Sequence, residues 1–416
     1  MQSPQASPYI RILQIDVLRG FALLGIYWMN VSVFAIPSAI FGIPNQLGEM
    51  PMLNTAFWAF SKVFVEGSMR GLFSVLFGGS ALIFLDEARQ IASGTELIDR
   101  FYRRNMILIL FGVLHAFFLV WPYDVLYSYG LIGMFLFPLR KISPKKLLIA
   151  SAVLFILAEI NFQELAGRIY PEEQAVKSQQ KYTERIENMN VYDSLMYQQK
   201  EETKLFQSGY LKIFSKKFSE VAADQSTKMY NDHFYDIGGM MLLGMALMKL
   251  GILSGNSSLL FYFLLMIFGY ATGITYRGYY AWEAITNNLR PEFYLGNYDS
   301  NYTLGRLPIT LGHVGLIGIL CKLKFLNWIT DLLSYIGRMA LTNYIMQTLI
   351  SIFIFYGFGL GLYGKLEHYE LVYFILGMWI FQLSFSRIWL QYFRQGPLEW
   401  IWRSLIYGRT EKFRKG

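Results

Sequence analysis

Apolar residues dominate the chain in windows of about 20 residues, and short polar stretches separate these windows. About 20 helical residues are needed to cross the hydrocarbon core of a bilayer. We therefore predict an all-α fold, a polytopic helical membrane bundle of about ten transmembrane helices. The predicted spans are 15–36, 71–92, 106–121, 125–139, 147–162, 234–249, 259–275, 304–321, 332–357 and 371–390.

Three shorter patterns refine this outline. The spans 106–121 and 125–139 are joined by the sequence WPYD, which predicts a tight helical hairpin. The segment 54–66 predicts an additional short helix at the membrane interface. The segment 211–221, LKIFSKKFSEV, has apolar residues at helical spacing and predicts a helix on the membrane surface.

The composition changes abruptly between the fifth and sixth predicted spans, where residues 163–232 are polar and of mixed charge. Within this region the sequence YPEEQAVKSQQKYTERIENMN, 170–190, predicts an exposed helix. We therefore expect an N-terminal membrane bundle at 1–162, an extracytoplasmic loop at 163–232 and a C-terminal membrane region at 233–416.

Cationic residues predict the orientation, because loops rich in lysine and arginine stay in the cytoplasm. They gather in alternate connections and at the C-terminus, so both termini are expected on the cytoplasmic side of the membrane. The lysines within 163–232 weaken this orientation without refuting it, because long loops are exempt from the rule. The orienting residues are Arg89, Arg100, Arg103, Arg104, Arg140, Lys141, Lys145, Lys146, Lys322, Lys324, Arg403, Arg409, Lys412, Arg414 and Lys415.

Composition supports a membrane protein and removes other classes. The chain is 54% hydrophobic and 17% aromatic but only 16% charged, and its net charge of +8 fits basic loops rather than nucleic-acid binding. The single cysteine, Cys321, excludes an intrachain disulfide. None of the four histidines is spaced from another like a metal pair, so no metal is expected. The expected partners are the lipid bilayer and a small-molecule substrate, and a homodimer is left open.

Polar residues inside the predicted spans are the candidate functional residues, because an ionisable group at bilayer depth is costly and normally faces a partner or a cavity. Four of them also have a structural interpretation: Asp16 and Arg19 as a local pair, His115 as a bridge between helices and Asp124 as a helix cap. The sequence GPLEWIWR, 396–403, which contains Glu399 and Arg403, has one as a tryptophan–arginine interface anchor. The candidates are Asp16, Arg19, Asn30, Arg70, His115, Asp124, Arg306, Arg338, Asn343, Gln347, Glu399 and Arg403.

The sequence GRMALTNYIMQTLI, 337–350, concentrates four polar side chains in one predicted span. Arg338, Thr342, Asn343 and Gln347 recur at helical spacing and would share one face of a single helix. That face is expected to point into a cavity shared with the first and third spans. Arg338→Ala should then abolish function while leaving the protein inserted.

Five motifs resemble the YeiB-like family of bacterial inner-membrane proteins. They are DVLRGFALLGI, GVLHAFFLVWPYDVLYSYGLIGM, GGMMLLGMALMKLGIL, GRMALTNYIMQTLI and WLQYFRQGPLEWIWR, which occur in this order over nearly the whole chain. The family is similar in turn to a wider superfamily of transmembrane acyltransferases. These enzymes move an acyl group, typically from cytosolic acyl-CoA, to an acceptor at the membrane.

The superfamily resemblance includes one match and one departure. Asp16, Arg19, Gly20 and Asn30 match its D-x-x-R-G element and the intramembrane asparagine that follows. Sugar-acetylating relatives carry a catalytic histidine near the start of the second span, where this chain reads SKVFVEGSMRGLF. Either His115 supplies the base from another helix or acyl chemistry is absent.

The acyltransferase hypothesis assigns roles to these residues. His115 would be the general base, oriented by Asp124 if the hairpin folds back, and Asn30, Asn343 or Gln347 would stabilise an oxyanion. Arginines near the cytoplasm would hold the phosphates of acyl-CoA, a co-substrate; no bound cofactor is expected. The residues assigned to substrate or co-substrate binding are Asp16, Arg19, Arg70, Arg338, Asn343, Gln347, Glu399 and Arg403.

Two other classes of function remain open. In a small-solute transporter or ligand-binding membrane protein, the same polar residues would line a substrate path. A receptor or scaffold that binds a partner through its external loop is the third class. The sequence leaves the choice between enzyme and transporter undecided.

Overall fold

The computed structural model describes residues 11–41, 51–91, 94–159, 191–289 and 302–415. These residues form helices and no sheet, apart from one isolated bridge between Phe393 and Arg414, so the all-α prediction is confirmed for them. The predicted helix at 170–190 lies outside the described residues. The main helices are α1 (Leu13–Ala35), α2 (Pro51–Phe60), α3 (Ser68–Ile91), α4 (Thr95–Phe118), α5 (Leu126–Met134), α6 (Leu136–Leu139), α7 (Pro144–Glu159), α10 (Val191–Phe206), α11 (Tyr210–Ala223), α12 (Phe234–Lys249), α13 (Leu259–Thr286), α15 (Tyr302–Lys322), α16 (Asn327–Arg338), α17 (Ala340–Phe355), α18 (Leu371–Tyr392) and α19 (Pro397–Tyr407).

Short distorted segments connect some of these helices. The π-helical segments η2 (Ser61–Val65) and η3 (Asp224–His233) lead directly toward α3 and α12. The 3₁₀ turns η1 (Ser38–Ile40) and η4 (Lys324–Leu326) follow α1 and precede α16.

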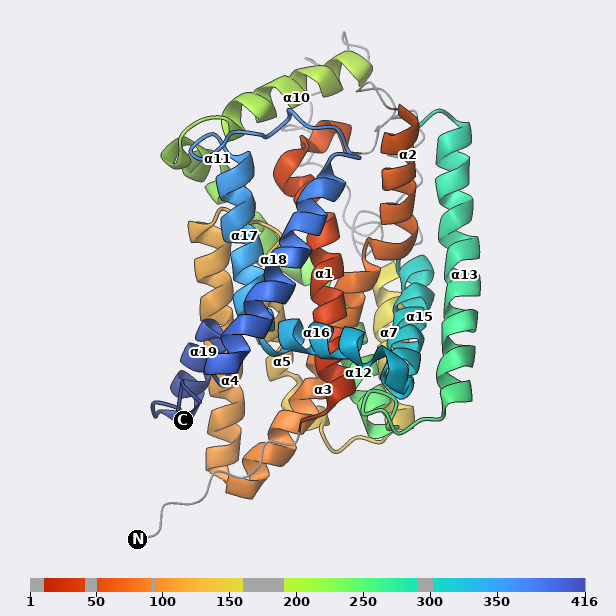
Figure 1. The fold of residues 1–416 in the computed structure, drawn as a ribbon, viewed down its shortest axis with the longest axis vertical. Coiled ribbons are helices and arrows are strands. Elements are labelled where there is room, and N and C mark those ends of the chain that lie inside the picture. Colours follow the sequence, from red (N-terminus) through yellow and green to blue (C-terminus); the bar gives the residue numbers. More distant parts are fainter. Residues whose placement is uncertain (1–10, 42–50, 92–93, 160–190, 290–301, 416) are drawn as a thin grey trace, which may run out of the picture.

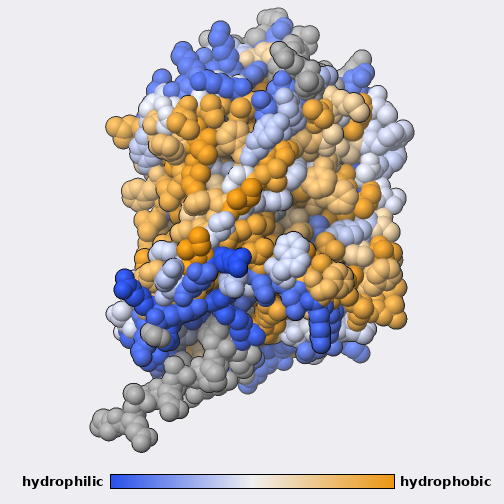
Figure 2. All heavy atoms as spheres, in the orientation of Figure 1, coloured by the Kyte–Doolittle hydropathy of each residue, from blue (hydrophilic) through white to orange (hydrophobic). Residues whose placement is uncertain are grey.

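Most of the long helices stand roughly parallel to one long axis, whereas α16 and α10 lie across it (Figure 1). On the face drawn in Figure 2, hydrophobic residues form a broad band around the middle and hydrophilic residues gather at both ends. Helices α10 and α11 lie at one end, and α19 lies toward the other (Figure 1). This distribution is compatible with a membrane protein.

Five stretches of the described chain are long and apolar enough to cross a membrane: α1, Pro51–Asp86, α4, α13 and α18. The pair Gly305–Lys322 and Lys324–Arg338, bent by 97°, makes a sixth if it is counted as one span. The prediction of ten spans is therefore not confirmed. Helices α12 and α17 have 16 residues each and reach only about 24 Å, less than a hydrocarbon core of about 30 Å.

The predicted single span 332–357 is wrong, because the helix breaks at Met339. This residue has φ −117° and ψ 33°, outside the helical range, and it separates α16 from α17. The break is stabilised by Glu399, whose Oε1 accepts hydrogen bonds from the N–H groups of Leu341 (2.7 Å) and Thr342 (3.1 Å). A new helix start exposes such donors, and the buried carboxylate satisfies them. Arg338 therefore does not share a helix with Asn343 and Gln347.

The predicted interface helix 54–66 and the predicted span 71–92 belong to one stretch. Pro51–Asp86 is apolar over 36 residues and is interrupted near Gly67, which has φ 69°. A positive φ is accessible to glycine without a steric penalty, so the chain turns here and resumes as α3. Arg70, predicted to open a span, instead lies near the middle of the 36-residue stretch.

The predicted hairpin at WPYD is confirmed as a turn between α4 and α5. Helix α4 begins at Thr95, earlier than the predicted 106, and the partner span is divided at Phe135 into α5 and α6. The predicted amphipathic helix 211–221 lies within α11, whose Tyr210 hydroxyl donates a hydrogen bond to the carbonyl of Phe118 (2.7 Å). Helix α11 therefore packs beside the hairpin.

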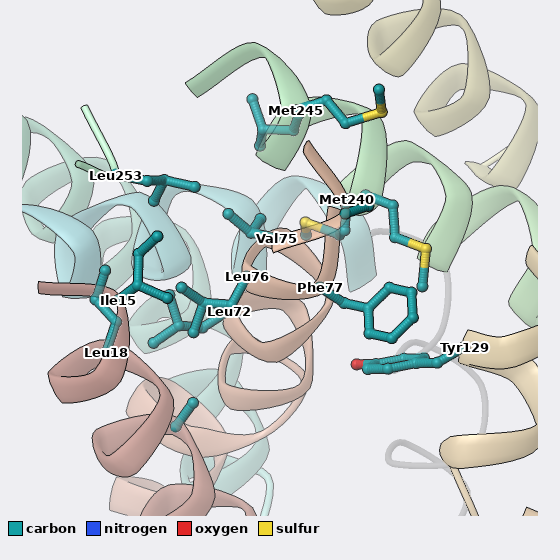
Figure 3. Close-up of a cluster of buried hydrophobic side chains, with 14 of the residues drawn as sticks. Ile15, Leu18, Leu72, Val75, Leu76, Phe77, Tyr129, Met240, Met245 and Leu253 are labelled. Carbon is teal, nitrogen blue, oxygen red and sulfur yellow. The ribbon is translucent and has the colours of Figure 1, made fainter. Parts of the chain in front are cut away.

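The main apolar core lies where α1, α3, α5 and α12 meet (Figure 3). Leu18, Leu72, Met240 and Met245 are all fully buried there. Methionine side chains fill irregular gaps well, because they are unbranched and polarizable. The core holds the helices that carry the buried charged residues described below.

Helices α1 and α16 approach so closely that only glycine fits at the contact. A Cβ atom at Gly20 would lie 2.0 Å from the carbonyl oxygen of Leu333, and one at Gly337 would lie 1.9 Å from that of Asp16. Both clashes are with backbone, which side-chain movement cannot relieve. The contact fixes the position of α16 across α1.

Gly20→Ala should therefore lower the melting temperature, with a loss of about 1–3 kcal/mol or more from overpacking. The control is Gly377→Ala in α18, where a Cβ meets nothing within 4 Å and the stability should hold or rise slightly. Thermal unfolding in detergent measures both variants. Equal melting temperatures for the two variants would contradict the close contact.

Candidate functional site

Three residues from separate elements form a hydrogen-bonded series that we call the imidazole relay: Asp124, His115 and Thr348. Nδ1 of His115 lies 2.7 Å from Oδ1 of Asp124, and Nε2 lies 2.9 Å from the hydroxyl oxygen of Thr348. An ionised carboxylate only accepts, so Nδ1 carries the proton and Nε2 accepts from the threonine hydroxyl. The relay has the carboxylate–imidazole–hydroxyl order that general-base enzymes use.

The folding back of the hairpin brings Asp124 to His115. The other carboxylate oxygen of Asp124 accepts the backbone N–H of Tyr127 (2.9 Å) in the first turn of α5. Gly112 allows the approach, because a Cβ there would lie 2.2 Å from the backbone nitrogen of Tyr127. The two structural interpretations therefore also hold: His115 bridges α4 and α17, and Asp124 caps α5.

The relay is sealed from solvent. The side chains of His115 and Asp124 are both 0% exposed, and the ring of Tyr344 packs against the imidazole at 5.0 Å between centroids. The hydroxyl of Tyr344 and the indole N–H of Trp121 come near each other, but neither meets hydrogen-bond geometry with a described partner. Two donors are thus available beside the relay.

A second buried group, which we call the arginine pair, consists of Arg70 and Arg306 on either side of Asp236. Arg70 Nη2 lies 3.0 Å from Oδ2 of Asp236, and Arg306 forms an ion pair with the other carboxylate oxygen. The Arg306 side chain is 0% exposed and that of Asp236 is 7% exposed, whereas that of Arg70 is 28% exposed. Two guanidinium groups therefore share this carboxylate.

Tyr129 connects α5 to the helix that carries Arg70. Its hydroxyl lies 2.7 Å from Oγ of Ser74 and donates to the carbonyl of Arg70 at 3.2 Å. Figure 3 shows the Tyr129 ring beside Phe77, with the hydroxyl directed toward α3. Asp124 lies two residues before the start of the same helix. Helix α5 therefore holds the imidazole relay and the arginine pair at fixed positions relative to each other.

Three further cationic groups lie where α1 begins and α16 ends, and we call them the inner arginines: Arg11, Arg19 and Arg338. Arg11 Nε lies 3.2 Å and Arg19 Nη1 lies 3.3 Å from the carboxylate of Asp16. The charge of Arg11 also acts on Arg338, whose Nη2 reaches the carbonyl of Arg394 at 3.5 Å. The structure therefore brings Asp16, Arg19 and Arg338 together, as a group separate from the imidazole relay.

The buried amides of α17 have structural partners. The side-chain NH₂ of Asn343 donates to the hydroxyl of Ser386 (2.9 Å), and that of Gln347 donates to Gln382 (3.0 Å). These donors join α17 to α18, and the atoms without a partner are the acceptor oxygens of Asn343 and Gln347. An oxyanion needs donors, so neither amide fits the predicted role as arranged.

The remaining predicted residues lie elsewhere. Asn30 is half-buried near the end of α1, and no described contact joins it to the relay. Glu399 is buried against the start of α17, where Oε2 also accepts the hydroxyl of Thr342 (2.6 Å). Burial raises the pKa of Glu399, and its hydrogen bonds from Thr342 and Leu341 oppose that rise. Arg403 is half-buried on α19, whose Trp402 donates to the carbonyl of Arg104 (3.1 Å).

Two members of the site were missed by sequence reasoning. Thr348 follows Gln347 directly, but a threonine in an apolar helix carries no chemical signal of its own. Asp236 opens the predicted span 234–249, so the rule that selected Arg70 applied to it as well. In the described part of the chain, no three histidine, cysteine or acidic residues gather as metal ligands.

Comparison with known proteins places this architecture in a family. The model described as "Protein of unknown function (DUF418)" matches residues 247–409. The "Uncharacterized protein YxaH" of Bacillus subtilis is 30% identical over 413 residues, covering 95% of this chain and 94% of its own. The "Uncharacterized protein YeiB" of Escherichia coli is 29% identical over 411 residues, covering 95% of this chain and 96% of its own.

The chain belongs to the YeiB-like family. The sequence resemblance to this family is thereby confirmed, while similarity to acyltransferases is not shown by these matches. A third match, the "Uncharacterized 39.9 kDa protein in amylase 3'region" of Bacillus acidopullulyticus, is 25% identical over 406 residues, covering 96% of this chain and 94% of its own. No solved structure matches. The matched region 247–409 contains Thr348 and the inner Arg338, whereas His115, Asp124 and Arg70 precede it.

Proposed function

We propose that this YeiB-like protein is a membrane-embedded acyltransferase that moves an acyl group from cytosolic acyl-CoA to an acceptor at the membrane. The observation that carries the proposal is the imidazole relay. A histidine oriented by a buried carboxylate and bonded to a hydroxyl is suited to deprotonating an alcohol. An imidazole can take a proton from the acceptor and return it to the leaving group, as the reaction requires.

The proposed reaction follows from the relay. The acceptor hydroxyl replaces the hydroxyl of Thr348 at Nε2 of His115, which requires the threonine to rotate away. His115 takes the proton as the acceptor oxygen attacks the thioester carbonyl. The hydroxyl of Tyr344 and the N–H of Trp121 stabilise the oxyanion of the tetrahedral intermediate. As the C–S bond breaks, the imidazolium returns the proton to the departing CoA thiolate.

The inner arginines are assigned to the phosphates of CoA. Guanidinium groups bind phosphate oxygens in pairs, and three arginines around Asp16 leave an excess of positive charge. The thioester then reaches inward past the start of α17. Basic residues concentrated in the connections at this end support a cytoplasmic location for it, in a bacterial inner membrane crossed several times by the chain.

A second candidate, transport of a small anionic solute, is supported by the broken helices. The π-helical segments η2 and η3 lead toward Arg70 and Asp236, and Pro308 lies within α15 two residues after Arg306. Interrupted helices around charged groups at mid-depth are a feature of secondary transporters. In this case the imidazole relay would gate or protonate rather than transfer an acyl group.

Thermal unfolding of the purified protein with acetyl-CoA, longer acyl-CoAs and free CoA tests the proposal. A ligand at about 100 times its Kd adds about 2.7 kcal/mol of stability by mass action, which is readily detected. We expect acyl-CoA to raise the melting temperature of the wild type, and Arg338→Ala to remove most of that rise. Arg409→Ala is the control, because this arginine is 61% exposed and pairs with Glu411 near the C-terminus.

Turnover is measured in parallel as acyl transfer from labelled acyl-CoA to a membrane-lipid and sugar extract. Stabilisation by acyl-CoA that depends on Arg338, together with transfer, supports the enzyme. Folded protein that no CoA species stabilises would reject the acyltransferase in favour of transport, to be followed by uptake of anionic solutes into proteoliposomes.

A further inference from the structure

The arginine pair lies at a depth where charge is costly. Arg70 is near the middle of the 36-residue apolar stretch Pro51–Asp86, and the junction of α2 and α3 falls inside the apolar band when Figures 1 and 2 are compared. Leu72, two residues after Arg70, and Met240, four residues after Asp236, are fully buried in the core. Charged groups at this depth normally have a functional reason to be there.

The local charge balance favours an anion. Among the described residues, Asp236 is the only carboxylate that Arg70 contacts, and Arg70 shares it with Arg306, so the charge of Arg70 is only partly compensated. Tyr129 and Ser74, which adjoin Arg70, are neutral. A cation would be repelled by this arrangement. A phosphate or carboxylate would instead complete the charge balance and gain charge-assisted hydrogen bonds that are stronger than neutral ones.

Arg70 has the donors to bind such a group. A guanidinium carries five N–H donors in a planar fork, and its bond to Asp236 leaves most of them unused within the described structure. Its side chain is 28% exposed, whereas Arg306 on the far side of the carboxylate is 0% exposed. Arg306 thus holds Asp236 in place, and Arg70 presents the accessible edge of the group.

The backbone around the group supplies an independent indication. Two of the three residues follow a π-helical segment, η2 before Arg70 and η3 before Asp236, and Pro308 lies inside α15 two residues after Arg306. A π-helical segment is less stable than an α-helix, and such segments are frequent at functional sites. Two π-helical segments that lead to one charged group indicate a binding site rather than a chance ion pair.

We propose that Arg70, supported by Asp236 and Arg306, binds the phosphate or carboxylate head group of an amphiphilic acceptor within the membrane. The apolar depth of the site requires the rest of the ligand to be compatible with the bilayer interior. That this ligand is the acyl acceptor rests on the proposed acyltransferase function, in which α5 holds Arg70 at a fixed position relative to His115. Binding of the anionic head group does not depend on that function.

The probe is dodecyl phosphate, titrated into the purified protein in a neutral detergent and followed by thermal unfolding and by calorimetry. Dodecanoate tests the carboxylate form, inorganic phosphate tests the free ion, and dodecyltrimethylammonium is the cationic control. We expect stabilisation by dodecyl phosphate and dodecanoate and none by the cation. If inorganic phosphate stabilises the protein as much as dodecyl phosphate does, the proposal of an amphiphilic ligand is overturned and the site binds a free anion.

Two variants and a control assign the binding. Arg70→Gln should lower the affinity for dodecyl phosphate by at least about tenfold. Arg70→Lys should lower it by a smaller factor, because lysine keeps the charge but loses the planar fork. The control Arg387→Gln, an exposed arginine on α18, should bind like the wild type. Monodisperse elution in size-exclusion chromatography shows that each variant is folded. If Arg70→Gln does not fold, Arg70→Lys still tests the proposal. Wild-type affinity in a folded Arg70 variant would overturn the proposal.

The outcomes separate the two proposals. Arg70-dependent binding of dodecyl phosphate without any response to acyl-CoA supports the anion site and rejects the acyltransferase. A response to acyl-CoA without Arg70-dependent binding of either amphiphile supports the acyltransferase and rejects the anion site.

Discussion

Asp124→Asn should lower the turnover number of acyl transfer on the order of 10³- to 10⁴-fold while leaving the fold intact. The asparagine preserves the shape of the side chain, but its amide no longer stabilises an imidazolium. It also permits the tautomer in which Nε2 of His115 carries the proton. In that tautomer Nε2 cannot take the proton of the acceptor hydroxyl. His115→Gln removes the base altogether and should abolish transfer, leaving acyl-CoA binding at the inner arginines unchanged.

Acyl transfer and acyl-CoA-dependent thermal stabilisation are measured on the same preparations. A loss of transfer with retained stabilisation assigns the relay to chemistry rather than to folding. Tyr210→Phe is the matched control, because it removes one hydrogen bond to the end of α4, at Phe118, without touching the relay. Transfer by Asp124→Asn at the rate of this control would show that the Asp124–His115 contact is only structural.

Glu399→Ala should destabilise the protein by about 2–4 kcal/mol, because it leaves two buried N–H donors without an acceptor. Those donors belong to Leu341 and Thr342, and the start of α17 also loses a carboxylate that favours the positive end of the helix. The melting temperature in detergent should fall clearly. Glu399→Gln is the control, since its amide oxygen can still accept the backbone donors.

The pH dependence of stability separates the charge of Glu399 from its hydrogen bonds. Burial raises the pKa of Glu399 above its ordinary value of 4.5, so the folded state holds the proton more tightly than the unfolded state. The stability contributed by this proton is present below pH 4.5 and is lost as the pH rises through the raised value. Glu399→Gln should remove that decline. A decline of equal size in the glutamine variant would assign it to another group.

The path from sequence to site can be followed in GRMALTNYIMQTLI. Hydropathy and helical spacing indicated a buried helix with a polar face, and Thr342, Asn343 and Gln347 are indeed buried on α17. Spacing along one chain cannot reveal that Glu399, 57 residues after Thr342, supplies the carboxylate acceptor that lets a new helix begin at Ala340. The break at Met339 and the separate position of Arg338 follow from that distant contact.

The sequence by itself determined the all-helical class, the apolar segments, the family and the roles open to His115 and Asp124, because these depend on local composition and on residue chemistry. Only the tertiary structure decided which groups meet. The relay needs the hairpin to fold back against Gly112, and Thr348 lies 233 residues from His115. The arginine pair likewise brings together residues of three helices, Arg70 of α3, Asp236 of α12 and Arg306 of α15. Burying a charge is costly, so each ionised group depends on partners that are distant in the sequence.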